Sequence, residues 1–167
     1  MKNIYLIGMR GSGKTTIGKI LAEKLGKEFT DMDQEIELMS GNKITTIVEE
    51  EGWKTFRLLE KEIVERICQK ENQVVGTGGG VLMCFDNADK FKKTGTLIFL
   101  RTSPETIIQR LSKVEERPSL TGENFLEEIE NVWKERKDTY EKHADLDIDT
   151  EEKTPNIIAE EIIKKIN

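Results

Sequence analysis

Runs of apolar residues alternate along the chain with segments of helical periodicity. Runs typical of buried β-strands occupy 4–8, 28–30, 73–77, 96–101 and 145–149. Helical patterns are expected at 14–26, 53–71, 81–92, 104–112, 124–142 and 155–166. Strands that alternate with helices form right-handed crossovers, so the pattern predicts an α/β fold with a parallel sheet and helices on both faces. Ligands of such sheets bind beyond the carboxyl ends of the strands.

Composition narrows the class of protein. The 167 residues suggest one domain, and 35% charged with 36% apolar residues is typical of a soluble globular protein. A formal charge of −6 without a basic stripe argues against nucleic acid as a partner. Cys68 and Cys84 have no metal-ligand spacing and are expected to be reduced core residues. No signal peptide or membrane span is apparent, which predicts a cytoplasmic protein without a membrane partner.

The first apolar run leads into a phosphate-binding motif. Residues 8–15 read GMRGSGKT, which matches GxxxxGK[ST] between an expected strand and an expected helix. Glycines let backbone N–H groups surround phosphate oxygens, Lys14 would reach the outer phosphates, and Thr15 would hold Mg²⁺. A tight strand-to-helix turn would explain the glycines but not Lys14 and Thr15. The motif therefore predicts binding of a nucleoside triphosphate.

Two carboxylates follow the second strand. Asp31 and Asp33 are two residues apart where the chain leaves the strand, and we expect their side chains to point to opposite sides. Capping of a helix near Gln34 is the alternative for one of them. The third strand ends in Thr77 and glycines, with no Asp to assist the metal. This favours Asp31 as the second Mg²⁺ residue and leaves Asp33 to accept or orient a hydroxyl proton.

Two arginines occupy helical positions where apolar residues are expected. Arg57, with Glu60 three residues later, lies in a seam that also contains Trp53, Val64 and Ile67. Arg136 lies in a second seam, with Leu126, Ile129, Trp133 and Tyr140. An unpaired buried Arg is costly, so each needs an anion. Structural ion pairs and a clamp on an acidic substrate both remain open.

Two further segments are candidates for substrate contacts. Three glycines at 78–80 exceed what a turn needs and suggest that a substrate approaches backbone N–H groups. The polar stretch 112–124 reads as a mobile lid, in which Arg117 could neutralise a transferring phosphoryl group. The lone histidine, His143, has no nucleophile pattern around it and is expected to be incidental.

Taken in order, these motifs resemble those of the shikimate kinases. The shared pattern is a phosphate loop, Asp-x-Asp, Phe-Arg-x-x-Glu, a glycine triplet, Arg-Pro and Arg-x-x-x-Tyr, here residues 8–15, Asp31/Asp33, Phe56-Arg57/Glu60, 78–80, Arg117-Pro118 and Arg136/Tyr140. The resemblance implies a three-layer P-loop NTPase fold like that of nucleoside monophosphate kinases, with a five-stranded parallel sheet. It also implies a single domain over 1–167, with a substrate-binding region at about 32–61 and a lid at about 112–124, in a protein that is usually monomeric.

The same resemblance implies phosphorylation of the shikimate 3-hydroxyl by ATP, in the pathway to chorismate and the aromatic amino acids. It implies catalytic roles for Asp33, Lys14 and Arg117, and Mg²⁺ ligation by Thr15 and, through water, Asp31. ATP would contact Gly11, Ser12, Gly13, Lys14, Thr15, Thr16, Arg110, Arg117 and Lys153. Shikimate would contact Asp33, Arg57, Gly79, Gly80 and Arg136.

Two positions depart from the family pattern: Ser119 stands where Leu is commoner, and Val48 replaces a larger apolar residue, which could cost about 1 kcal/mol of acceptor packing. Three other classes of protein fit the sequence less well. A gluconate-type or other small-molecule kinase would not need the arginines and glycine triplet together. A GTPase-like switch needs Asn-Lys-x-Asp, but Asn42-Lys43 continues with Ile44-Thr45. An ATP-binding module without catalysis would leave Asp33 and Arg117 unexplained.

Overall fold

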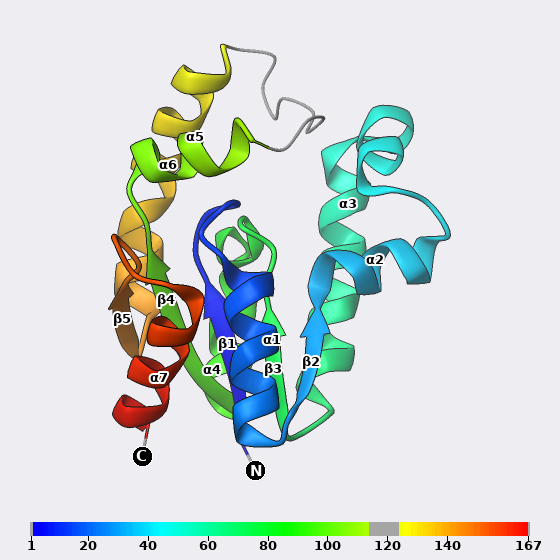
Figure 1. Ribbon diagram of the computed structural model, residues 1–167. Coiled ribbons are helices and arrows are strands. Elements are labelled where there is room, and N and C mark those ends of the chain that lie inside the picture. Colours follow the sequence, from blue (N-terminus) through cyan, green and yellow to red (C-terminus); the bar gives the residue numbers. More distant parts are fainter. Residues whose placement is uncertain (1, 114–123, 167) are drawn as a thin grey trace.

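The computed structural model describes residues 2–113 and 124–166. Five strands form one sheet, namely β1 (Asn3–Ile7), β2 (Glu28–Asp31), β3 (Gln73–Gly76), β4 (Gly95–Arg101) and β5 (Leu146–Asp149) (Figure 1). The helices are α1 (Lys14–Leu25), α2 (Met32–Ser40), α3 (Ile44–Cys68), the 3₁₀ helix η1 (Val81–Met83), α4 (Phe85–Thr94), α5 (Pro104–Leu111), α6 (Phe125–His143) and α7 (Pro155–Ile166).

The sheet is parallel throughout, with strand order β2-β3-β1-β4-β5. Side chains alternate between its faces: Tyr5 and Ile7 belong to a hydrophobic cluster shared with α3, α4 and α6, whereas Ile4 and Leu6 belong to one shared with α1 and α7. Helices therefore cover both faces of the central strand, and the predicted α/β fold with five parallel strands is confirmed.

The region after β2 differs from the expected pattern. A single helix was expected at 53–71, but the chain forms α2, which ends at Gly41 (φ 74°), and then α3, which starts at Ile44 and kinks at Gly52 (φ 83°). Asp33 lies in the first turn of α2, so its direction relative to Asp31 is set by the helix and not by an extended strand, on which residues two apart share a side. The expected helix at 81–92 is divided into η1 and α4. Most of the expected lid, residues 114–123, lies outside the described residues.

Helix α1 lies unusually close to the sheet. A Cβ atom on Gly18 would lie 3.0 Å from Cδ2 of Phe29 on β2 and 3.3 Å from Cδ1 of Leu6 on β1. Real side chains do not approach so closely without moving a neighbour. The absence of a side chain at position 18 therefore sets the distance between α1 and the strands beneath it.

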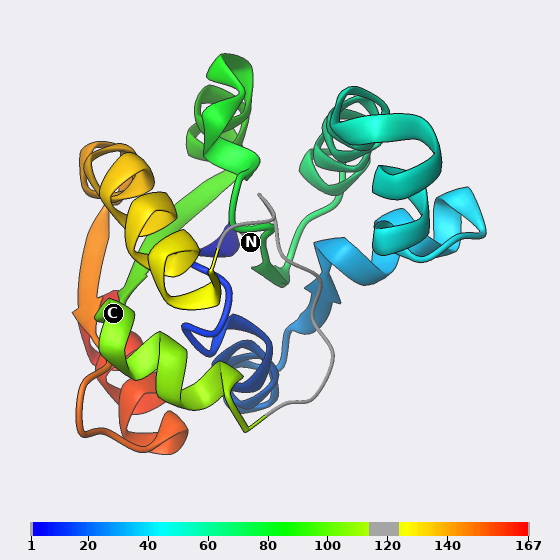
Figure 2. The same ribbon diagram turned by 90° about the horizontal axis from the view of Figure 1, so that it is seen from above.

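All five strands end at the same edge of the sheet. The segments that follow them, including the phosphate loop and the glycine triplet, meet at this edge, with α3 and α6 to either side (Figure 2). No helix within residues 2–113 and 124–166 combines the length and apolar character needed to cross a lipid bilayer. The edge where the strands end is where the predicted chemistry lies.

Candidate active site

The phosphate loop connects β1 to α1. Its glycines Gly8, Gly11 and Gly13 have φ values of 141°, 78° and 95°, a region that side chains disfavour. Lys14 Nζ donates to the carbonyls of Gly8 at 2.8 Å and Met9 at 2.7 Å, so its ammonium group lies within the loop. Helix α1 starts at Lys14, and its first N–H groups face the same space. The loop thus has the geometry of a polyphosphate site.

Thr15 and Asp31 are neighbours beside this loop. Thr15 Oγ1 donates to Asp31 Oδ2 at 2.9 Å, while Asp31 Oδ1 accepts from the backbone N–H groups of Asp33 and Gln34 at 3.1 and 3.4 Å. Asp31 therefore caps α2 and faces Thr15 at once, so the capping role is confirmed and the role in binding Mg²⁺ stays a prediction. A hydroxyl and a carboxylate are hard oxygen ligands of the kind Mg²⁺ accepts alongside substrate phosphates. The pair fits a magnesium ion.

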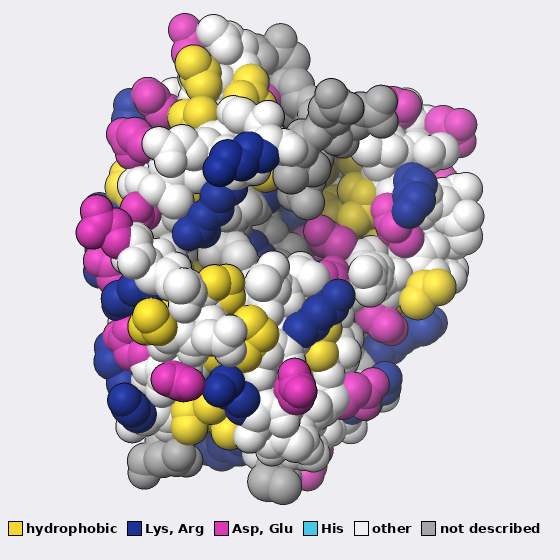
Figure 3. Space-filling model, in the orientation of Figure 1, with side chains coloured by type: hydrophobic (Ala, Val, Ile, Leu, Met, Phe, Trp, Pro, Cys, Tyr) yellow, Lys and Arg dark blue, Asp and Glu magenta, His cyan; other side chains and the backbone are white. Residues whose placement is uncertain are grey.

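A cavity of about 370 Å³ opens next to the loop. The surface is hollowed between the α5/α6 side and the α2/α3 side, with acidic side chains visible on the wall (Figure 3). The cavity is lined by all five residues that the sequence predicts to contact the acceptor. Val48 and several charged and aromatic residues also line it. We call this space the acceptor cavity; its predicted lining residues are Asp33, Arg57, Gly79, Gly80 and Arg136.

Arg57 lies on the cavity wall and is fixed there by contacts with its own helix, α3. Its Nη1 lies 2.7 Å from Oε2 of Glu60, whose side chain is 1% exposed, and its guanidinium lies over the rings of Trp53 and Phe56 at 5.8 and 5.3 Å. Burial raises the pKa of Glu60, Arg57 opposes this rise, and the nearby Asp33 adds to it. The two residues therefore form a structural ion pair whose carboxylate is buried, and this carboxylate fixes the arginine on the cavity wall.

Arg136 reaches the cavity from α6, one turn before Tyr140. The Tyr140 hydroxyl donates to the carbonyl of Gly79, and burial raises its pKa to about 12 in spite of the nearby Arg136. The Nε atom of Arg136 is buried and has no hydrogen-bond partner within the described part of the chain. Leu126 is 48% exposed, so its expected place in this seam is wrong, whereas Ile129 and Tyr140 are buried as expected.

The glycine triplet makes room for three charged side chains. A Cβ at Gly78 would lie 2.9 Å from Glu60 Oε1, one at Gly79 would lie 3.5 Å from Arg136 Nη1, and one at Gly80 would lie 2.8 Å from Arg57 Nη1. The spacing along the chain signalled three unusual glycines but not this reason for them. The expected approach of substrate to their N–H groups stays a prediction.

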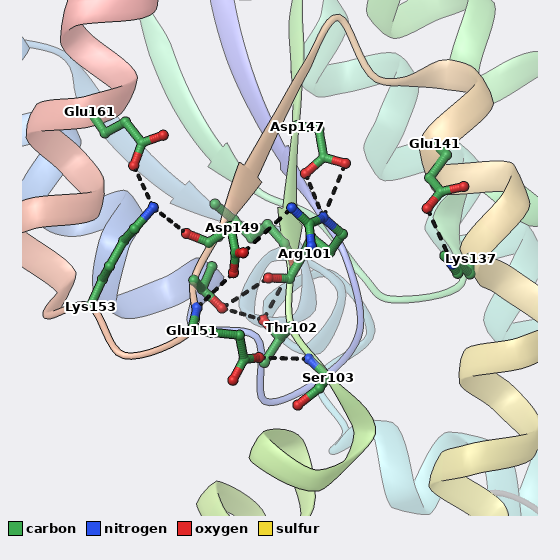
Figure 4. A network of polar contacts seen from close by, with 12 residues as sticks. Arg101, Thr102, Ser103, Lys137, Glu141, Asp147, Asp149, Glu151, Lys153 and Glu161 are labelled. Atoms are coloured by element: carbon green, nitrogen blue, oxygen red, sulfur yellow. Dashed lines mark hydrogen bonds and ion pairs between the residues drawn. The ribbon is translucent and has the colours of Figure 1, made fainter.

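The remaining donor-side residues lie on α5 and after β5. Arg110 Nη1 donates to the carbonyl of Gly11 at 3.2 Å, so α5 contacts the phosphate loop. Lys153 Nζ donates to the carbonyl of Asp149 at 2.9 Å and to Glu161 at 2.7 Å, which ties the loop after β5 to α7 (Figure 4). Ser12 is buried in the loop and Thr16 is exposed on α1. Arg117 and Ser119 lie outside the described residues.

Glu151, which the sequence did not single out, links this loop to α5. Its carboxylate accepts from the backbone N–H of Ser103 at 2.8 Å (Figure 4). It also accepts from the Thr106 hydroxyl at 2.6 Å. Burial opposes ionisation of Glu151, but the hydrogen bonds from Ser103 and Thr106 outweigh it and lower the pKa. Ser103-Pro104 is a recognisable helix start, yet nothing local indicates a partner 48 residues further on.

Arg10 and Glu128 are a second pair that the motifs did not reveal. Arg10, within the phosphate loop, lines the acceptor cavity, and its Nη2 lies 3.7 Å from Oε1 of Glu128 on α6. The sequence shows Arg10 at one of the variable positions of the phosphate-binding motif. Its partner could not be found there, because the contact depends on how α6 packs beside the loop.

Comparison with known proteins identifies the family of the chain. The shikimate kinase family matches residues 10–167. A shikimate kinase of Persephonella marina is 46% identical over 166 residues, covering 99% of both chains, and one of Thermodesulfovibrio yellowstonii is 44% identical over 165 residues, covering 99% of this chain and 95% of the relative.

Solved structures give the same result. The shikimate kinase from Acinetobacter baumannii in complex with shikimate has a TM-score of 0.94 at 36% identity, covering 99% of this chain and 93% of that one. A gluconokinase from Sinorhizobium meliloti reaches a TM-score of 0.57 at 18% identity, with 98% and 90% covered, and so shares the fold alone. By sequence, structure and the motifs of its site, the chain belongs to the shikimate kinase family, whose members are small-molecule kinases.

Proposed function

We propose that the protein transfers the γ-phosphoryl group of ATP to the 3-hydroxyl of shikimate. The observation that carries the proposal is the acceptor cavity beside the phosphate loop, where Asp33 lies with two arginines held for an anionic ligand. Arg57 already has a counter-ion in Glu60, whereas the buried Nε of Arg136 has no hydrogen-bond partner among the described residues. A carboxylate supplied by the acceptor would satisfy this guanidinium.

Each group then has one task. Arg57 and Arg136 bind the acceptor carboxylate, the backbone at Gly79 and Gly80 contacts the ring substituents, and Asp33 orients the 3-hydroxyl and accepts its proton. Positioning of this kind supplies most of the catalysis in phosphoryl transfer, because little covalent chemistry is left for the protein. These assignments make the acceptor side selective for a hydroxy acid.

The donor side is built from the loop and α5. Backbone groups at Gly11, Ser12 and Gly13 surround the phosphates, Lys14 leaves the carbonyls of the loop to contact the outer phosphates, and Arg117 stabilises the transferring group. Thr16, Arg110 and Lys153 complete the nucleotide site. Mg²⁺, held by Thr15 and Asp31, would neutralise phosphate charge when bound.

Other properties follow the family. We infer a monomer in the cytoplasm that acts in aromatic amino-acid biosynthesis and binds neither nucleic acid nor membranes. The net charge of −6 supports the absence of a nucleic-acid partner, because phosphate contacts require clustered cations.

A coupled assay of ADP release tests the proposal. With ATP and Mg²⁺, shikimate should stimulate turnover to about 1–100 s⁻¹, the range of kinases, whereas gluconate should have no effect. Phosphorus NMR of the product would identify a phosphate ester at the 3-position. Stimulation by gluconate but not by shikimate would overturn the assignment in favour of a gluconate-type kinase.

A further inference from the structure

Two arginine–glutamate pairs border the acceptor cavity. In the first, Arg57 is 27% exposed and its partner Glu60 is 1% exposed. In the second, the side chain of Arg10 is 17% exposed and that of Glu128 is fully buried. Both arginines line the cavity, and in both pairs the carboxylate lies behind the arginine and away from solvent. The second pair repeats the arrangement of the first from a different part of the chain.

The path of the Arg10 side chain explains why it reaches this cavity. A Cβ on Gly79 would lie 3.5 Å from the backbone N of Arg10 and 3.5 Å from Nη1 of Arg136, so the loop and Arg136 border the same small space. The Arg10 guanidinium lies 5.9 Å from the centre of the Phe125 ring, at the start of α6. The side chain therefore runs from the phosphate loop to α6 along the cavity wall.

The contact between Arg10 and Glu128 is electrostatic. At 3.7 Å it is an ion pair but too long for a hydrogen bond. Taking both charges out of water is unfavourable, and apolar side chains of similar size could anchor a loop to a helix as well. A buried carboxylate behind a cavity-lining arginine is instead suited to fixing the position of a charge that a ligand will contact.

We infer that Arg10 is a third acceptor-binding arginine, supplied by the phosphate loop itself, and that Glu128 is the positioning residue that holds it. Arg10 would donate to an oxygen of an anionic hydroxy-acid acceptor, next to the carboxylate site formed by Arg57 and Arg136. The inference rests on the proposed function, since it concerns the same acceptor. It makes one loop contribute to both substrate sites.

The test compares Arg10→Met and Glu128→Gln with Glu141→Gln. Glu141 pairs with Lys137 at 3.6 Å on the same helix but is 42% exposed, so it controls for loss of a carboxylate from α6. Calorimetric titration with shikimate, without nucleotide, should show Kd raised roughly tenfold or more in Arg10→Met, as expected for loss of a hydrogen bond to a charged group. Glu128→Gln should raise Kd less, and Glu141→Gln should leave it unchanged.

Steady-state kinetics separate this role from a structural one. KM for shikimate should rise in both Arg10→Met and Glu128→Gln, while KM for ATP changes less than about twofold. The double variant Arg10→Met/Glu128→Gln should bind shikimate no worse than Arg10→Met alone, because Glu128 acts through Arg10. Arg10→Lys, which keeps the charge, should recover part of the affinity.

Three results would count against the inference. Normal shikimate affinity in Arg10→Met, or equal increases in both KM values, would reduce Arg10 to a part of the loop's structure. A loss of thermal stability in Glu128→Gln with unchanged KM for shikimate would show that Glu128 has a structural role only, and this result can be obtained even if Arg10→Met does not fold. Absence of shikimate-dependent activity in the unaltered protein would instead overturn the proposed function.

Discussion

At the scale of single residues, space and charge are arranged together in the acceptor cavity. Gly78, Gly79 and Gly80 lie against Glu60, Arg136 and Arg57 respectively, so each glycine leaves room for one charged side chain. The backbone of Gly80 has φ −100°, which any residue can adopt. Its requirement for glycine therefore comes from its neighbour and not from its own conformation.

Gly80→Ala should consequently impair acceptor binding without unfolding the protein. The new methyl group would displace the Arg57 guanidinium and weaken its hydrogen bonds to the acceptor, raising KM for shikimate roughly tenfold. KM for ATP and the melting temperature should change little. Kinetics of Gly80→Ala in an Arg57→Ala background provide the control, since the extra methyl should have little further effect once the guanidinium is removed.

Asp33 is the residue whose change should affect turnover most. Asp33→Asn keeps the size of the side chain but removes the base, so kcat should fall by roughly 10²-fold or more. Glu35→Gln, on the same helix and outside the cavity lining, is the matched control and should retain normal kcat. Near-normal kcat in Asp33→Asn would leave Asp33 with an orienting role at most.

Much of the site could be predicted because its chemistry leaves marks in the sequence. A phosphate loop needs fixed glycines and Lys14, and an arginine in an apolar seam stands out, as Arg57 and Arg136 do. Arg10 and Glu128 leave no such mark, since their pairing joins residues far apart in the chain. Asp33 is separated from Asp31 by the start of α2 and not by strand alternation, since residues two apart on a strand share a side.

At the scale of elements, the strands and most helices were predictable and the segment between β2 and β3 was not. Strands that are buried on both faces are continuous apolar runs, so the ends of each run mark the ends of the strand. Helix α3 is interrupted at Gly52, and its first part, up to residue 51, ends in three consecutive glutamates at 49–51. Ile44, Ile47 and Val48 lie on one face of this part and pack against the core, but a face of three residues is too short to predict a helix by itself.

The link between the loop after β5 and α5 leads to a prediction about stability. Glu151 supplies a remote cap for α5, so Glu151→Gln should lower the free energy of unfolding by about 1 kcal/mol at pH 7. Since the pKa of Glu151 is lowered in the folded state from its ordinary 4.5, this stabilisation is present above that pH and is lost as pH falls through the folded pKa.

Urea unfolding of the unaltered protein and of Glu151→Gln between pH 3 and 7 measures the difference in their free energies of unfolding. Asp147→Asn is the control, because Asp147 binds Arg101 on the neighbouring strand and makes no hydrogen bond or ion pair with α5 among the described residues. A difference between wild type and Glu151→Gln that did not shrink toward pH 3 would show that the carboxylate charge does not stabilise the cap.

At the scale of the whole molecule, two hydrophobic clusters share one sheet. Because neighbouring residues of β1, β3 and β4 alternate between them, neither cluster can lose its packing without exposing the strands that complete the other. This supports the prediction that residues 1–167 form a single domain, which should unfold in one cooperative transition. Two resolved calorimetric transitions would contradict it.

Ligand binding provides a second measurement on the whole molecule. At 100 times its dissociation constant, shikimate should stabilise the folded state by about 2.7 kcal/mol, which corresponds to roughly 5–11 °C in Tm for a chain of this size. Gluconate at the same concentration should leave Tm unchanged. Because no turnover is needed, the result is independent of the kinetic assays.

The close approach at Gly18 has a consequence for how far the two substrates lie apart. Helix α1 begins with Lys14 and Thr15, and Thr15 meets Asp31 at the end of β2, the strand whose Phe29 packs against Gly18. The packing at position 18 thus sets where Thr15 and Asp31 meet, and with it the expected spacing of the two substrate sites. Gly18→Ala should change this spacing without altering any residue proposed to contact a substrate.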